Sequence, residues 1–235
     1  MTKVIKTSLL VMALMTPTLS YGQSSTTNSI YIEQVGDASN ITLTQSGQGN
    51  EIGNRTTDTP MTLQGDNQTV TVTMDGNSNK INGDIKQSDG SSTTVSLTGD
   101  SNDMKFDVGN SGDTGGSTTT FTVAGSSNQI EFNQGKVSSA TNLTQTFTLT
   151  GDLNTITQNV ETNDVNNAFV IAGDSNIINT KQNGAAGKNI DMTLTGNQNN
   201  VTVNQTSTLN VDSIKLNSTS TGSTITINQC NAGAC

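Results

Sequence analysis

Histidine and tryptophan are absent from this 235-residue sequence, and cysteine and proline occur only twice each. Without histidine the chain cannot build a Ser-His-Asp triad, and two cysteines alone fall short of a zinc site. Charged residues make up 12%, which is fewer than in the usual disordered chain that charge keeps open. Hydrophobic residues make up 30%, which is too few for an ordinary globular core. The remainder is a polar chain with evenly spaced apolar residues, which is typical of repetitive β structure.

Other chemistry-bearing motifs are also missing. The sequence has no G-x-S-x-G motif, no clustered pair of carboxylates and no glycine-rich phosphate loop with a lysine. Asp100, Asp152 and Asp174 recur beside repeated glycines, but the tandem nonapeptides of calcium-binding β-rolls are absent, so we interpret these residues as turn formers. The net charge of −9 disfavours nucleic acid, because phosphate contacts need lysine and arginine. We therefore predict a protein without catalytic residues, metal site, cofactor or nucleic-acid partner.

The first 22 residues have the features of a secretory signal peptide. Two lysines form a basic start, and the apolar stretch LLVMALM (Leu9–Met15) is too short to span a bilayer. Small residues in SYG fit a cleavage site, which places the cut after Gly22, although an uncleaved anchor is the alternative. We expect residues 23–29 to form a short N-terminal segment. The mature chain is then secreted to the extracellular space or the cell surface, with no membrane span.

The last six residues, 230–235, form a cysteine-containing tail, CNAGAC. In an exported protein, Cys230 and Cys235 are candidates for a disulfide bond. The closed loop would be short, so we expect it to fix the tail and to stabilise the rest of the chain little.

A repeated phrase of glycine, two residues and asparagine runs through the chain between the tail and the N-terminal segment. The later glycines are spaced 22 to 26 residues apart, a period that indicates stacked repeats. Gly36 and Gly65 open looser copies of the phrase. The Gly–Asn pairs are Gly47 and Asn50, Gly76 and Asn79, Gly99 and Asn102, Gly125 and Asn128, Gly151 and Asn154, Gly173 and Asn176, and Gly196 and Asn199.

Apolar residues alternate with polar ones on both sides of each phrase. In the unit around Gly151, for example, Phe147 and Leu149 precede the glycine and Ile156 follows it. Period-two alternation predicts a strand with one apolar face, and glycine and asparagine suit the turn between strands because both tolerate positive φ. All five phenylalanines fall on inward positions. Each unit is thus a strand, a tight turn, a second strand and a variable return loop.

One such unit cannot bury its apolar face alone, but stacked units can. We therefore predict that residues 30–229 form an all-β solenoid of about eight or nine strand–turn–strand rungs in two narrow parallel sheets. With strands about 4.8 Å apart, the rod is roughly 40 Å long.

Several second strands end in glutamine. Gln134, Gln182 and Gln205 each follow the turn asparagine by six residues. Inward amides in a stack can hydrogen-bond to their own copies above and below, which predicts a ladder. The alternative is that these are ordinary polar strand ends.

These residues resemble the curlin repeat of curli, the bacterial extracellular amyloid fibre, which reads S-x5-Q-x-G-x2-N-x-A-x3-Q. SNITLTQSGQGN (Ser39–Asn50) matches the first half, with Gln45 before Gly47. NQIEFNQ, NIINTKQ and NNVTVNQ match the second half with Ile or Val in place of Ala. In most units the glutamine before the glycine is replaced by Leu, Val or Ile, and the copies exceed the usual five. The resemblance implies secretion and nucleated polymerisation, by end-to-end self-association or with related subunits, into an adhesive or biofilm fibre.

Two other functions stay open. A capped, monomeric solenoid could bind a flat surface such as ice, because outward positions three residues and one residue before the glycines form near-regular threonine columns. Thr122, Thr148 and Thr193 belong to the first column, which Val170 interrupts. Threonine is also an ordinary solvent-facing strand residue, which we favour as the explanation. A viral or phage fibre component is the other alternative, although a signal segment indicates a cell-exported product.

Overall fold

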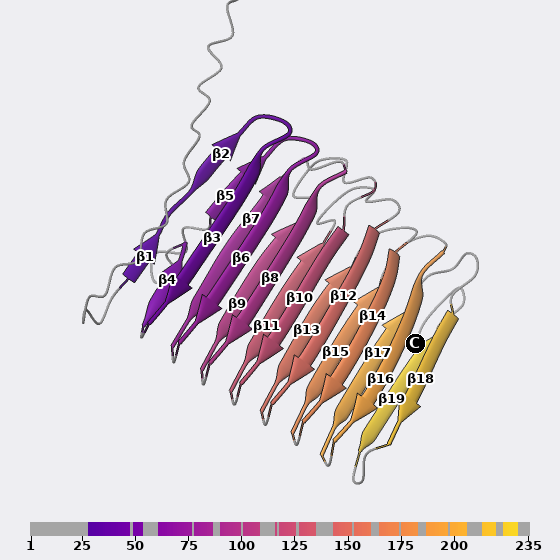
Figure 1. Cartoon of the computed structure of the whole chain (residues 1–235). Helices are drawn as coiled ribbons and strands as arrows, with labels where there is room; N and C mark the ends of the chain where they lie inside the picture. Colours follow the sequence, from indigo (N-terminus) through magenta and orange to yellow (C-terminus); the bar gives the residue numbers. More distant parts are fainter. Residues whose placement is uncertain are drawn as a thin grey trace, which may run out of the picture.

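The computed structural model describes residues 28–47, 49–53, 61–76, 78–86, 90–99, 101–108, 116, 118–125, 127–134, 143–151, 153–160, 165–173, 175–182, 187–196, 198–205, 213–219 and 223–229. Strands and turns make up this part of the chain, and they stack along one axis (Figure 1). None of it forms a helix of the length and apolarity that crossing a membrane requires. The predicted signal segment, the cysteine tail and the three aspartates beside the turn glycines lie outside the described residues.

One sheet has eight strands, and each of them is the first strand of a repeat. In chain order they are β3 (Asn40–Ser46), β6 (Thr69–Asp75), β8 (Ser92–Thr98), β10 (Thr118–Ala124), β12 (Leu143–Thr150), β14 (Val165–Ala172), β16 (Asn189–Thr195) and β18 (Ser213–Ser218). Spatial order follows chain order from β3 at one end to β18 at the other.

The second sheet has eleven strands and contains the second strand of each repeat. They are β1 (Asn28–Ile30), β2 (Glu33–Val35), β4 (Asn50–Ile52), β5 (Met61–Gln64), β7 (Lys80–Lys86), β9 (Asp103–Val108), β11 (Gln129–Gln134), β13 (Thr155–Val160), β15 (Ile177–Gln182), β17 (Asn200–Gln205) and β19 (Thr224–Gln229). Spatial order again follows chain order, so each rung contributes to both sheets.

The strands pair in parallel, each with its equivalent in the next repeat. Phe121 lies opposite Phe147, and Phe147 lies opposite Phe169. Eight first strands, together with the additional layer of β1 and β2, confirm the predicted all-β solenoid of about eight or nine rungs in two narrow parallel sheets.

The first two layers of the eleven-stranded sheet are split, which the sequence pattern does not predict. β4 and β5 both pair with β7, through Ile52 opposite Ile81 and Met61 opposite Gly83. β1 and β2 repeat this division, because β1 pairs with β4 and β2 with β5. A single continuous strand was the expectation for each of these layers.

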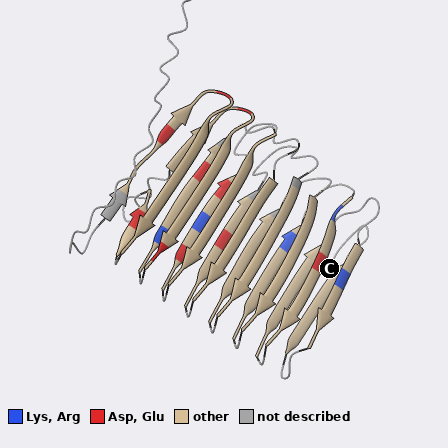
Figure 2. Cartoon of the chain, in the orientation of Figure 1, with Lys and Arg blue, Asp and Glu red and all other residues tan. Residues whose placement is uncertain are grey.

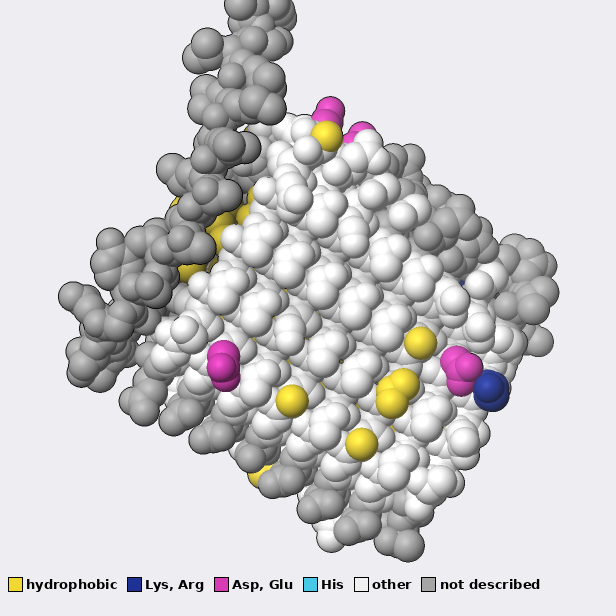
Figure 3. Space-filling view, viewed as in Figure 1, with side chains coloured by type: hydrophobic (Ala, Val, Ile, Leu, Met, Phe, Trp, Pro, Cys, Tyr) yellow, Lys and Arg dark blue, Asp and Glu magenta, His cyan; other side chains and the backbone are white. Residues whose placement is uncertain are grey.

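The outer faces of the two sheets differ in charge. The strands of the eleven-stranded sheet contain Glu33, Glu51, Lys80, Asp84, Asp103, Lys105, Asp107, Glu131 and Lys181, most of them in the N-terminal half of the stack (Figure 2). The eight-stranded sheet contains Asp75, Asp191 and Lys215. Its outer face is even and mostly uncharged (Figure 3).

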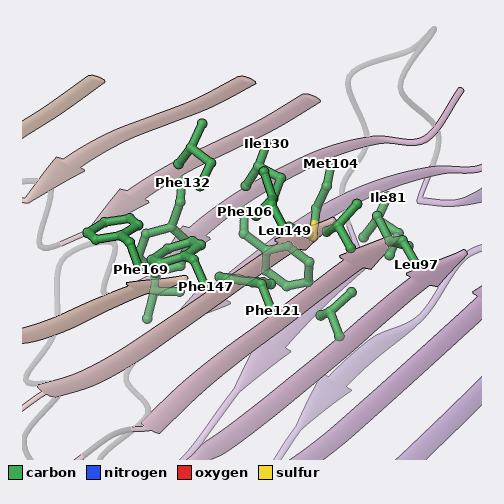
Figure 4. Packing of buried hydrophobic residues seen from close by; sticks show 14 of the residues in the cluster. Ile81, Leu97, Met104, Phe106, Phe121, Ile130, Phe132, Phe147, Leu149 and Phe169 are labelled. Carbon is green, nitrogen blue, oxygen red and sulfur yellow. The ribbon is translucent and has the colours of Figure 1, made fainter. Parts of the chain in front are cut away.

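A thin apolar core fills the space between the two sheets. All five phenylalanines are buried, at 0–1% exposed area. Phe121 and Phe147 have ring centroids 5.1 Å apart, and Phe147 and Phe169 stack at 4.9 Å with nearly parallel rings (Figure 4). Phe132 reaches from the other sheet and meets Phe147 edge-on at 5.8 Å. The predicted inward positions therefore meet one another across the rungs and between the sheets.

The interpretation of Gly36 and Gly65 as further copies of the repeated turn is wrong. Gly36 follows β2 and Gly65 follows β5, so both lie on the opposite edge, where the chain returns to the eight-stranded sheet. They stack on each other, because the N–H of Gly36 donates to the carbonyl oxygen of Gln64 at 2.9 Å. The spacing to a downstream polar residue resembles that of the repeated phrase, but these glycines follow a second strand and not a first one.

Candidate functional site

A column of glycines forms the turn between the two strands of each rung. The seven glycines predicted for this turn have positive φ, from +120° at Gly47 to +156° at Gly196. The N–H of Gly125 donates to the carbonyl oxygen of Thr150 in the next rung at 3.0 Å, and the neighbouring turns repeat this bond. A Cβ on Gly151 would overlap the carbonyl oxygen of Gly125 and lie 2.7 Å from its carbonyl carbon. Backbone therefore packs on backbone, and a side chain does not fit.

The turn asparagines face the interior. Asn50, Asn79, Asn102, Asn128, Asn154, Asn176 and Asn199 are all buried, at 0–1% exposed area. The side-chain Nδ2 donates to the carbonyl oxygen of the turn glycine at 3.0 Å from Asn50 and at 3.3 Å from Asn128. These asparagines do not have the positive φ proposed as their reason, since the described non-glycine residues with positive φ are Ala38 and Asn67. Each of these asparagines instead places a buried side-chain amide inside the turn.

Asn128→Ala is expected to lower the free energy of unfolding by about 1–2 kcal/mol, because it removes a buried amide and leaves the Gly125 carbonyl oxygen without its donor. Urea unfolding followed by circular dichroism measures the change. Asn179→Ala is the matched control, because Asn179 is exposed on the outer face of β15. Equal effects of the two substitutions would contradict an interior role for the turn asparagines.

Glutamines stack only where they meet in register. Gln182 lies opposite Gln205, and the side chain of Gln182 donates to that of Gln205 at 3.3 Å in the buried interior. Gln229 extends the column by one rung. Gln134 ends β11, where its neighbours in register are Val108 and Val160. No glutamine ladder passes through that position.

Gln45 is buried at the end of β3 and lies opposite Met74. The positions that follow in this column are Leu97 and Val123. Gln45 is therefore the one amide at the N-terminal end of a column that is otherwise apolar as far as β16. The replacement of glutamine in later repeats accounts for this change.

A further buried amide pair was missed in the sequence. Gln145 of β12 and Gln158 of β13 are both 1% exposed, and the amide of Gln158 donates to the carbonyl oxygen of Gln145 across the core. The signal was present, since Gln145 lies two residues before Phe147 and Gln158 two residues after Ile156, both inward positions. The predicted strand faces were based on alternating apolar residues. Polar residues at inward positions therefore gave no sign of being buried.

The ends of the stack are where the interior columns stop. The outer edges of β18 and β19 have no strand partner among the described residues, and the same is true of β3 and of the β1–β2 layer. Ile225 and Ile227 of β19 are 39% and 41% exposed, although their column neighbours Val201 and Val203 are buried. Ile214 and Leu216 of β18 are partly buried.

The two ends present matching side chains in the same order, and five of the six positions hold the same residue type. In the eight-stranded sheet, the columns that end at Ile214, Leu216 and Ser218 begin at Ile41, Leu43 and Gln45. In the other sheet, Ile225, Ile227 and Gln229 end columns that begin around Ile30, Ile32 and Gln34. Each end thus has four aliphatic residues and two polar ones at equivalent positions.

Within the described residues, no cluster of three or more His, Cys, Asp or Glu side chains could hold a metal ion. No family model matches this chain, and neither a curated protein nor a solved structure does. The functional argument therefore depends on the geometry of the stack and on the sequence pattern.

Proposed function

We propose that this chain is a secreted structural subunit, similar to curli subunits, that adds end to end to further copies and forms a fibre for a cell surface or biofilm matrix. The observation that carries this proposal is the match between the two ends of the stack. The resemblance of Ser39–Asn50 and the later repeats to the curlin pattern supports it independently, and the signal-like N-terminal sequence supports export.

Strand edges at both ends offer rows of backbone donors and acceptors to another chain. β18 has six residues and β3 has seven, so one can continue the sheet of the other in the parallel register found inside the stack. β19 has six residues and meets the divided layer of β1 and β2. An added copy therefore forms the same kind of ladder as an internal rung.

The side chains favour the same arrangement. In continuous register, Ile214 meets Ile41 of the next copy and Leu216 meets Leu43, as in internal rungs. Ile225 and Ile227 become covered by the layer that contains Ile30 and Ile32. Each aliphatic side chain that loses its remaining exposure contributes about 1 kcal/mol. A slip by one residue would turn these side chains to the solvent face, so the ends also fix the register.

The experiment compares the mature chain with an end-blocked variant, Ile225→Lys with Ile227→Lys. The wild-type chain is expected to form filaments, and the variant to elongate at least about tenfold more slowly, because addition would bury two ammonium groups. The fold of the monomer should be retained, since both residues lie in the last rung and are already exposed. Sedimentation and electron microscopy measure the assembly, and circular dichroism the fold.

Thr226→Lys is the matched control, because Thr226 lies between the two isoleucines in β19 and points outward. It is expected to assemble nearly as the wild-type chain does. The end-blocked variant keeps an intact N-terminal end, so it should also stop wild-type filaments when added in small amounts. A wild-type chain that stays monomeric for days and binds no amyloid dye would contradict the proposal, as would equal elongation of the variants.

A further inference from the structure

The outer face of the eight-stranded sheet is a lattice of small hydroxyl side chains, which we name the threonine face. It consists of the outward positions of β3, β6, β8, β10, β12, β14, β16 and β18, and most of these positions are Thr or Ser. Besides the two columns expected from the sequence, a third contains an unbroken run of five threonines in register: Thr42, Thr71, Thr94, Thr120 and Thr146.

Charge is confined to the margins of this face. Asp75 is the last residue of β6, next to the turn, and Asp191 and Lys215 form an ion pair of 3.5 Å near the C-terminal end. The central strands β8, β10, β12 and β14 contain no charged residue. β14 turns Ala168, Val170 and Ala172 outward, and Val170 is 47% exposed. Depletion of charge at the centre, with charged residues at the margin, is one feature of protein–protein interfaces.

At the C-terminal margin of the face, two side-chain hydrogen bonds join neighbouring rungs. The hydroxyl of Thr219 lies 3.3 Å from that of Thr195 in the neighbouring rung, and the hydroxyl of Ser213 donates to Asn189 at 2.5 Å. These two bonds can remain in place when the face is covered, so removing water costs less at that margin. Threonine is also β-branched and loses little side-chain freedom on burial.

We propose that the threonine face pairs with the threonine face of a second copy of this chain. Eight strands at about 4.8 Å and seven residues at about 3.3 Å give about 890 Å² per copy, which is close to the standard size of about 800 Å² for a stable interface. An uncharged face of short side chains meets its own copy without like-charge repulsion, and the even surface allows close approach, as in paired sheets of a steric zipper (Figure 3). The face of the other sheet contains charges at Lys105, Asp107 and Glu131 and does not share this property.

This lateral pairing is independent of end-to-end addition, and the test separates the two. In the end-blocked variant, sedimentation equilibrium is expected to show a dimer. Adding Thr122→Lys and Thr148→Lys, which lie side by side in register at the centre of the face, should raise the dimer dissociation constant about a hundredfold. Thr157→Lys with Asn179→Lys is the matched control, because these exposed residues are neighbours in register on the outer face of the other sheet.

A monomeric end-blocked chain would overturn the proposal, and so would a dimer that the threonine-face lysines leave intact. Inhibition of ice recrystallisation, or adsorption to cellulose or chitin particles, by a monomeric chain and its loss in the Thr122→Lys, Thr148→Lys variant would assign the face to that surface instead. A dimer that forms while the wild-type chain makes no filaments would support lateral pairing and contradict only the end-to-end proposal.

Discussion

Gly151→Ala is expected to lower the free energy of unfolding by about 3 kcal/mol or more, which is a severe effect for a single added methyl group. Two causes act together. The φ of +145° is one that L residues rarely adopt, and the new Cβ would overlap the carbonyl oxygen of Gly125. That oxygen belongs to the backbone of the adjacent rung and cannot move as a side-chain end could. The rungs must separate locally at the turn, which weakens the ladder that the Gly125 N–H forms with Thr150.

Gly116→Ala is the matched control for this substitution. Gly116 also has positive φ, at +76°, but nothing lies within 4 Å of the position that its Cβ would take. Gly116→Ala should lower the free energy of unfolding by only about 1–2 kcal/mol, because the strained backbone conformation is its one unfavourable effect. Urea unfolding in the end-blocked chain that also carries Thr122→Lys and Thr148→Lys compares the two substitutions without interference from assembly. If the midpoints shift equally, contact between stacked turns does not explain the repeated glycine.

The stacking of the chain could be predicted from the sequence because one interaction repeats in every rung. Alternation around each glycine identifies the inward residues, and a parallel stack places like residues together, as Phe121, Phe147 and Phe169 show. The period of 22 to 26 residues then gives the number of rungs. Local patterns of this kind do not depend on which return loop joins one rung to the next.

The sequence alone could not distinguish between two possible roles of the turn asparagines. A G-x-x-N phrase is equally compatible with an asparagine of positive φ and with one whose amide folds into the interior. The structure distinguishes them, since Asn67 has a φ of +55° at the return edge whereas Asn128 is buried and donates to Gly125. The difference arises from side-chain direction at the turn, which the sequence does not encode locally.

Features that occur in only one rung also could not be predicted from the repeat pattern. Gly83 takes an inward position of β7, where a Cβ would lie 2.5 Å from the Phe106 ring in the next rung. The small residue makes space for the large one, and this complementarity becomes visible only once the register is known. The division of the first layers into β1–β2 and β4–β5 likewise becomes visible only in the strand pairing.

The match between the two ends of the stack is a third property that can be recognised only when the strand register is known. Ile41 and Ile214 are far apart in the sequence, and the middle of their column holds Thr119, Gln145 and Asn167. A search for apolar columns in the sequence would therefore not connect the two isoleucines. Their correspondence follows from counting along the paired strands, and it is the basis for the end-to-end proposal.

Phe147→Ala is expected to lower the free energy of unfolding by about 3–5 kcal/mol, the range for emptying a buried aromatic site. Phe147 is fully buried and has Phe121, Phe132 and Phe169 as ring neighbours at 5.1, 5.8 and 4.9 Å. Neighbouring rungs are fixed by their ladders and cannot collapse into the cavity. Thr157→Ala is the control, because Thr157 is exposed on the outer face of β13, in the other sheet. Urea unfolding of the end-blocked chain that also carries Thr122→Lys and Thr148→Lys measures both.

The destabilisation by Phe147→Ala should also be greatest near the substituted rung. In a stack where each rung contacts only its neighbours, stability is the sum of the rungs and the interfaces between them. Phe147 contributes to both interfaces of its rung, with β10 and with β14. Amide hydrogen exchange should therefore rise most in β10, β12 and β14, and β6 and β18 should change little. A uniform rise along the whole chain would mean that the solenoid unfolds as one unit, and local coupling between stacked aromatic rings would then not account for its stability.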